Sequence, residues 1–179
     1  MKKLGKVLLV VLAGTVLCGG GAIGGGYALD PVIELQTSSV LDGSPQEIQR
    51  QLDSLEGVVD WWDTVAEDIA GGDQWKVVHV GGPTQGPGLE LDFQVNGESF
   101  EHWTLISSEP GKVVWEVDFG IFKTERTLSF VASGSGTEMT WHERGTMESP
   151  LLRWFRFMPT TSLLENFENA MEGLDASVQ

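Results

Sequence analysis

Two histidines on strand-like segments could act as general bases, because an unperturbed histidine titrates near pH ~6.5. His102 shares a strand face with the apolar Phe100, so it is the better candidate for a position inside the protein. His142 is out of phase with Trp141 and is expected to face solvent. Neither histidine has an obvious partner in the sequence, and a structural histidine remains the simpler interpretation.

Arg126 is the second candidate for catalysis or ligand binding, since it shares a strand face with Leu128. An inward-facing arginine could pair with a ligand carboxylate, or with Glu116 or Asp118 on the neighbouring strand. A cross-strand salt bridge at the surface is the simpler explanation.

Other catalytic and metal-binding patterns are missing from the sequence. There is no GxSxG motif for a serine nucleophile, no HExxH motif and no EF-hand loop. Cys18 is the only cysteine. Asp60, Asp63 and Glu67 share one helical face, which a solvated acidic surface explains. The sequence therefore predicts no metal site and no cofactor.

The N-terminal segment is apolar and free of charge from Val7 to Leu29, and Lys2, Lys3 and Lys6 precede it. This stretch of about 23 residues could cross a hydrocarbon core of about 30 Å as a helix. Lysines on its N-terminal side predict that this end stays in the cytoplasm. The remainder of the chain would then be extracytoplasmic, as the domain of a single-pass protein of the cell membrane.

A cleaved signal peptide is the alternative, because Val7–Leu17 has the length of a signal-peptide core and small residues permit cleavage after Ala22 or Ala28. The domain would in that case be secreted or periplasmic. Both interpretations divide the chain into an N-terminal segment, 1–29, and one domain, 30–179.

The domain is strongly acidic. The whole chain has a formal charge of −15, and the part from Asp30 onward has −18, because three of the 11 lysines and arginines precede it. Such a domain repels nucleic acid, so a nucleic-acid partner is not expected. It contains all seven tryptophans of the chain, which supply much of the apolar area for a core.

The order of expected elements is a strand, two short helices, six strands and a long helix. Ser44-Pro45-Gln46-Glu47 is a capping box with proline at the first helical position, and Asn96-Gly97 is a strong hairpin signal. The expected ranges are strand 31–41, helices 45–55 and 58–69, strands 75–80, 88–95, 99–107, 112–119, 124–132 and 137–145, and a helix capped by Ser162.

The last helix is amphipathic, with an apolar face that must be buried. A seven-stranded antiparallel sheet has an apolar face that needs cover. The pattern therefore predicts an α+β fold in which a curved sheet wraps around the C-terminal helix.

Three stretches resemble the START-like helix-grip superfamily, also called SRPBCC or the polyketide cyclase/dehydrase and lipid-transport group. They are SVLDGSPQEIQRQLDSLEGVVDWWDTV, the hairpin SGSGTEMTWHERG, and the C-terminal helix. The resemblance covers about residues 31–177. It implies a cavity between sheet and helix in which relatives bind lipids, sterols, quinones or polyketides, and in which some catalyse cyclisation or hydrolysis.

If alternate residues face such a cavity, its lining can be assigned by strand phase and helix face. The alternative is that these residues simply fill the core. The assigned residues are Trp115, Val117, Leu128, Phe130, Met139, Trp141, Leu164, Phe167, Met171 and Leu174.

The segment Pro150–Pro159 (PLLRWFRFMP) is apolar on nearly every side, and its only charged residues are two arginines. It could pack on the sheet as part of the domain, cover the mouth of the cavity, or contact a membrane. The residues in question are Leu152, Arg153, Trp154, Phe155 and Arg156.

The function that these features predict is non-catalytic binding or handling of a hydrophobic small molecule, such as a lipid, a quinone or a polyketide-like compound, by a membrane-tethered domain. Two alternatives stay open: a cyclase or hydrolase that acts on an apolar substrate in the same cavity, and an envelope protein–protein interaction domain without a ligand. The oligomeric state is not predicted.

Overall fold

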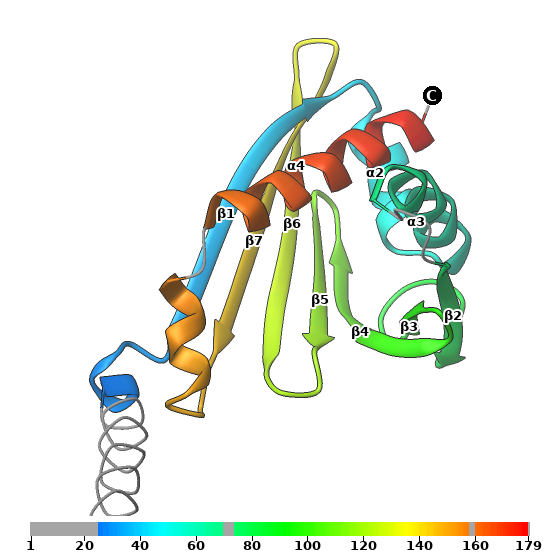
Figure 1. The fold of residues 1–179 in the computed structure, drawn as a ribbon. Coiled ribbons are helices and arrows are strands. Elements are labelled where there is room, and N and C mark those ends of the chain that lie inside the picture. Colours follow the sequence, from blue (N-terminus) through cyan, green and yellow to red (C-terminus); the bar gives the residue numbers. More distant parts are fainter. Residues whose placement is uncertain (1–24, 70–73, 158–159, 179) are drawn as a thin grey trace, which may run out of the picture.

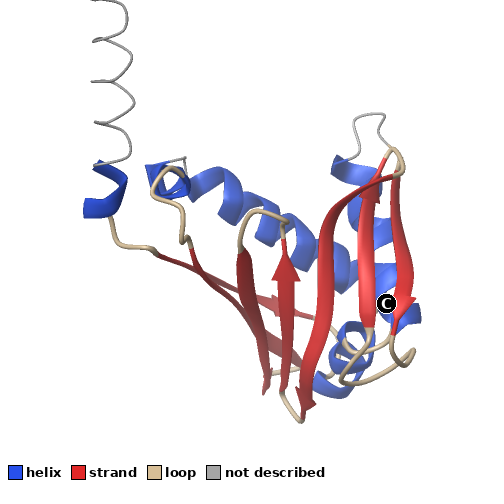
Figure 2. Cartoon of the chain, turned by 90° about the horizontal axis from the view of Figure 1, so that it is seen from below, coloured by secondary structure: helices blue, strands red, loops and turns tan. Residues whose placement is uncertain are grey.

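The computed structural model describes residues 25–69, 74–157 and 160–178, which form a seven-stranded antiparallel sheet with helices on one side (Figures 1 and 2). The strand order is β1-β7-β6-β5-β4-β3-β2. The strands are β1 (Val32–Leu41), β2 (Trp75–Gly81), β3 (Glu90–Val95), β4 (Glu98–Glu109), β5 (Lys112–Asp118), β6 (Lys123–Ser133) and β7 (Gly136–Thr146). The helices are α2 (Pro45–Leu52), α3 (Leu55–Ile69), the 3-10 helix η1 (Leu152–Phe157) and α4 (Thr160–Ser177).

The predicted fold class is confirmed: the sheet is curved, two helices follow the first strand, and α4 crosses one face of the sheet (Figure 1). α4 packs against α3 and β1, and α2 packs against α3. The helices therefore cover the face onto which the apolar strand positions project.

Local sequence signals account for two of the element boundaries. Ser44 and Glu47 form the reciprocal hydrogen bonds of a capping box, so α2 begins at Pro45 as expected. Asn96 and Gly97 have φ of 53° and 86°, the left-handed pair that a two-residue hairpin turn requires. The expected cap at Ser162 is wrong in position, because α4 begins two residues earlier, at Thr160.

β4 departs from simple alternation at two irregularities in its register. Phe93 pairs with Glu101 and Gln94 with Ser99, so Phe100 is an extra residue in the strand. A second irregularity lies between Leu105 and Ser107. Because a bulge shifts the phase of every side chain beyond it, the phase of β4 cannot be read by counting in twos.

Four fully buried tryptophans, Trp61, Trp103, Trp115 and Trp141, dominate the core. Two of them also tie layers together by hydrogen bonds. Trp61 Nε1 donates to the Ala170 carbonyl at 2.7 Å and joins α3 to α4, while Trp115 Nε1 donates to the Leu52 carbonyl at 3.2 Å and joins the sheet to α2.

The tryptophan hydrogen bond between α3 and α4 can be tested by Trp61→Phe. We expect this change to lower the free energy of unfolding by about 2 kcal/mol, because the hydrogen bond between α3 and α4 is lost and the smaller ring leaves buried space unfilled. Trp75→Phe is the matched control, since Trp75 Nε1 is buried with no acceptor among the described residues. Urea unfolding would measure both, and equal losses would contradict the role assigned to the Trp61 bond.

Candidate functional site

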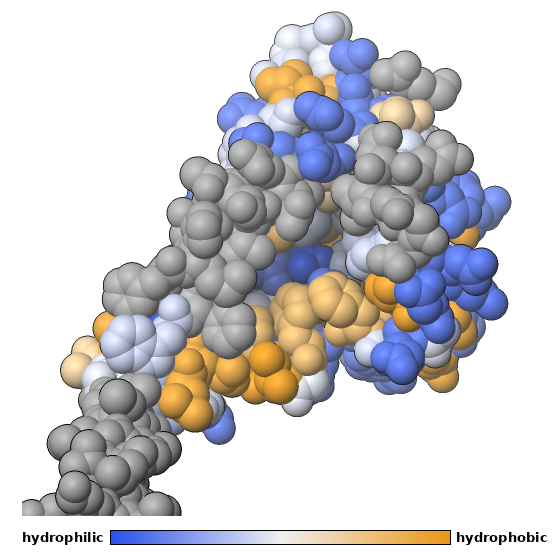
Figure 3. All heavy atoms as spheres, in the orientation of Figure 1, coloured by the Kyte–Doolittle hydropathy of each residue, from blue (hydrophilic) through white to orange (hydrophobic). Residues whose placement is uncertain are grey.

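A cavity of about 470 Å³ lies between the sheet and helices α3 and α4. Its walls are mainly aromatic and aliphatic. Figure 3 shows hydrophobic side chains along the rim of this hollow and hydrophilic atoms deeper inside. The apolar wall is formed by Ile33, Leu35, Trp62, Val65, Trp75, Phe100, Phe119, Phe122, Trp141, Phe167 and Ala170.

The cavity occupies only one end of the space between sheet and helices, next to the β5–β6 turn. Of the residues assigned to a cavity from the sequence, Trp141 and Phe167 line it. The others whose side chains are described belong to the buried core instead. These core residues are Trp115, Val117, Leu128, Phe130, Met139, Met171 and Leu174. The Leu164 side chain lies outside the described residues.

A buried ion pair sits in the cavity wall. Arg126 Nε donates to Glu143 Oε2 at 2.6 Å, and both side chains are about 95% buried. Glu143 also accepts hydrogen bonds from Thr124 Oγ1 and, at 3.1 Å, from Trp141 Nε1. Both carboxylate oxygens of Glu143 are therefore satisfied, as a charge removed from water requires.

The Arg126 guanidinium also lies between two indole rings. Its central carbon is 4.3 Å from the Trp103 ring centroid and 4.7 Å from that of Trp141. Such cation–π contacts strengthen when the groups are shielded from water. The guanidinium is thus held by a carboxylate and two aromatic faces.

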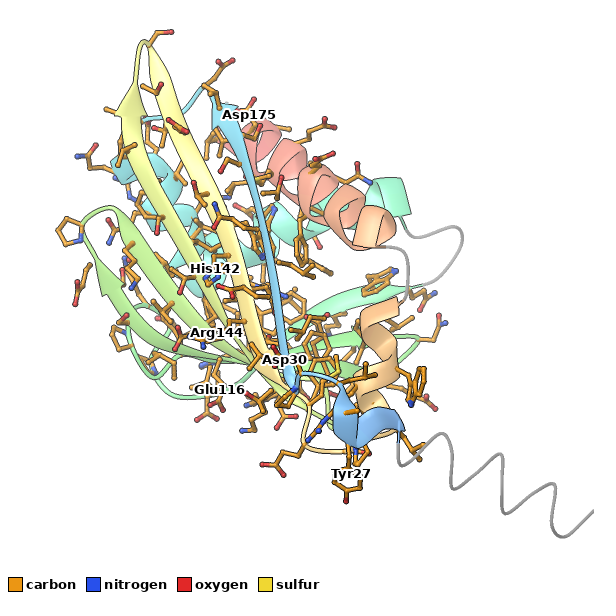
Figure 4. All side chains as sticks on the ribbon, turned by 90° about the vertical axis from the view of Figure 1, so that its left-hand side faces the viewer. Tyr27, Asp30, Glu116, His142, Arg144 and Asp175 are labelled. Carbon is orange, nitrogen blue, oxygen red and sulfur yellow. The ribbon has the colours of Figure 1, made fainter. Side chains whose placement is uncertain are left out.

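The two partners proposed for Arg126 from the sequence are wrong. Glu116 and Asp118 lie out of phase with Arg126 and pair with Lys123, at 2.7 and 3.4 Å. Figure 4 shows Glu116 among the side chains of the sheet. The actual partner, Glu143, could have been found from its phase, because it lies two residues after the inward-facing Trp141 on β7.

Glu101 supplies a second carboxyl group to the cavity wall. Its Oε2 accepts a hydrogen bond from Trp103 Nε1 at 2.7 Å. Burial raises the pKa of the Glu101 carboxyl, against the opposing effects of the Arg126 charge and the Trp103 hydrogen bond, and the Glu143 charge raises it further. Glu101 was missed from the sequence, although it is in phase with Trp103 on β4.

His102 does not reach the cavity, which corrects its assignment as a candidate base. Its Nδ1 lies 2.9 Å from Asp92 Oδ1, directly across the β3–β4 pair, and its side chain is 38% exposed. The expectation failed because the extra residue at Phe100 turns Phe100, rather than His102, toward the cavity. His142 is not part of the cavity wall either, and its Nε2 lies 2.7 Å from Glu34 Oε1.

η1 contacts the chain that precedes β1. Arg153 donates from Nε to the Met147 carbonyl at 3.0 Å and from Nη1 to the carbonyls of Gly26 and Leu29, each at 3.4 Å. Leu152 is half-buried, while Trp154 is 42% exposed and lies against Gly25. The side chains of Phe155 and Arg156 lie outside the described residues.

The polar groups of the cavity wall determine which ligand chemistry the site can serve. No group of three or more histidine, cysteine, aspartate or glutamate side chains gathers anywhere in the described part of the chain. Two carboxyl groups, one arginine and several indole N–H groups in an apolar wall can instead orient a polar group on an apolar ligand.

The sequence matches no family model and no curated protein. Solved structures show the fold. The domain has the helix-grip fold. Protein CV1439 from Chromobacterium violaceum has a TM-score of 0.60 at 12% identity, with 81% of this chain and 96% of that chain covered. Ara h 8.0201 has a TM-score of 0.58 at 14% identity, with 82% of this chain and 97% of that chain covered. TTHA0849 from Thermus thermophilus has a TM-score of 0.59 at 15% identity, with the same shares of the two chains covered.

These neighbours share the arrangement of sheet and helices described above. The identities are too low to carry a ligand or an activity across. Within residues 25–69, 74–157 and 160–178, no helix has both the length and the apolar character needed to cross a membrane.

The buried ion pair can be tested by Arg126→Met. We expect a loss of about 3–5 kcal/mol in the free energy of unfolding, because Glu143 keeps a buried charge without its partner. The double change Arg126→Met with Glu143→Leu should recover most of this loss. Lys123→Met, which removes a cation from an exposed pair on the same strand, is the matched control and should change little. A double variant no more stable than Arg126→Met alone would contradict the explanation.

Proposed function

We propose that this domain binds a hydrophobic small molecule, such as a lipid, a quinone or a polyketide-like compound, inside the cavity and without catalysis. The observation that carries the proposal is the cavity itself, with a volume of about 470 Å³ and a wall in which seven side chains are aromatic. Ligand sites for small molecules are typically concave, of about 300–1,000 Å³, and mostly apolar with a few polar groups.

We further propose that the N-terminal segment tethers the domain to a membrane with the cavity mouth toward the bilayer. The charge-free stretch that begins at Val7 ends at the short helix 25–28, and Figure 4 places Tyr27 on that helix beside η1. The β5–β6 turn lies at the same end of the domain (Figure 1) and contributes Phe119 and Phe122 to the cavity wall.

Exposed apolar side chains at this end support the same orientation. Tyr27, Ile121, Leu151 and Trp154 are between 42% and 68% exposed. Aromatic residues beside basic ones are favoured at the membrane–water interface. The central guanidinium carbon of Arg153 lies 5.8 Å from the centroid of the Tyr27 ring. A ligand could then pass between bilayer and cavity without crossing water.

The binding function can be tested by filling the cavity with Ala170→Phe. Ala170 lies on the cavity wall, so the added ring should weaken binding of the apolar fluorophore 1-aminoanthracene by about tenfold or more, a loss of at least about 1.4 kcal/mol. Ala176→Phe on the exposed face of the same helix is the matched control and should bind like the unmodified protein. Equal affinities in all three proteins, measured by fluorescence titration, would contradict binding in this cavity.

The tether can be tested by Leu12→Arg in the full chain. An arginine in the middle of an apolar span costs about 2.5–3.5 kcal/mol on insertion scales, so we expect the unmodified protein to stay with membranes after an alkaline carbonate wash and the variant to be released in part. Leu12→Phe is the apolar control. The intact mass decides between anchor and signal, because a mature chain that begins after Ala22 or Ala28 and is found in the wash would rule out the tether.

A further inference from the structure

We infer that the cavity takes an uncharged hydrophobic ligand with an oxygen acceptor, such as a ketone or quinone carbonyl, and that Glu101 in its protonated form donates a hydrogen bond to that oxygen. This inference rests on the proposed binding function and names the ligand chemistry of the same site. It assigns Glu101 a role in orienting the ligand.

The geometry leaves one Glu101 oxygen available to a ligand. The bulge at Phe100 places Phe100 and Glu101 together on the cavity wall. Trp103 Nε1 donates to Oε2, and because the carbonyl oxygen of a protonated carboxyl group is its better acceptor, this bond favours the proton on Oε1. Oε1 has no hydrogen-bond partner among the described residues, and the proton would therefore be free to bind an oxygen in the cavity.

The charges around Glu101 favour this protonated form. The described charged groups that act on it are Arg126 and Glu143, and these two already pair with each other at 2.6 Å. No further cation from the described residues neutralises Glu101, and its burial disfavours a second carboxylate. The raised pKa of Glu101 agrees with this arrangement.

The other polar groups of the wall also point to an acceptor on the ligand. Trp62 and Trp75 line the cavity, and their indole nitrogens are buried donors without an acceptor among the described residues. An anionic ligand would meet Glu143 and an arginine that is already paired. A cationic ligand would require Glu101 to be ionised, which its surroundings oppose.

Three ligands of similar shape can separate these possibilities. They are the ketone 2-acetylnaphthalene, the hydrocarbon 2-ethylnaphthalene and the cationic amine 1-(2-naphthyl)ethylamine. Their affinities for the full-length protein can be measured by displacement of bound 1-aminoanthracene. For each protein we take the ratio of its affinity for the ketone to its affinity for the hydrocarbon. This ratio is then compared between the unmodified protein and a variant, and the difference in hydration between the two ligands cancels because it is the same for both proteins.

We expect Glu101→Leu to lower this ratio about tenfold at pH 5, since one hydrogen bond is lost. In the unmodified protein the ratio should fall as the pH rises through the raised pKa of Glu101, because the donor proton is lost. Glu101→Gln should keep the ratio and remove its pH dependence, since the amide can accept from Trp103 and donate to the ketone. Glu98→Gln, an exposed position on the same strand, is the control for the change in charge.

Two results would overturn the inference and leave the binding function intact: a ratio that is equal in the unmodified protein and Glu101→Leu, or amine binding that is tightest and strengthens as the pH rises. Failure of all three compounds and of 1-aminoanthracene to bind would overturn the proposed function together with the inference. Thermal unfolding of each variant would show that it is folded before its affinities are compared.

Discussion

The cavity depends on how the protein buries one arginine. Arg126 projects from the middle of the sheet into a space that is otherwise apolar, and its charge is compensated by Glu143 and by the faces of Trp103 and Trp141. Thr124 and Trp141 satisfy the carboxylate in turn. An ion pair in an apolar wall is strongly destabilising if either charge lacks its partners, so a change at any one of these residues affects the others. The pair forms the polar part of the cavity wall.

Packing accounts for the position of the cavity along the fold. Apolar side chains of α2, α3 and the last turns of α4 pack with those of the strands in the buried core. At one end of the sheet the wall is made of large aromatic side chains whose shapes do not fill the volume, and the cavity remains there. The same end holds η1, the β5–β6 turn and the short helix before β1 (Figure 1). The cavity thus lies beside a packed core within one domain.

Much of the fold could be predicted from local patterns. The capping box at Ser44, the Asn96-Gly97 turn and the alternation in β5, β6 and β7 each depend on residues close together in the sequence. The site was harder to predict. Arg126 was found as a candidate, but its partner on β7 was not. Glu101 was not considered, because the bulge at Phe100 that sets its phase is not visible in the sequence. A carboxylate in phase with inward-facing tryptophans was the available signal.

The sequence by itself determined the elements, their order, the apolar face of the sheet and the acidic character of the domain, because these follow from residue type and short-range periodicity. Only the tertiary structure decided which inward-facing residues line a cavity and which fill the core, since that depends on how much space the helices leave. It also decided that His102 faces away and that Phe100 and Glu101 face in. A bulge forms between paired strands, and its phase shift is a property of that pairing.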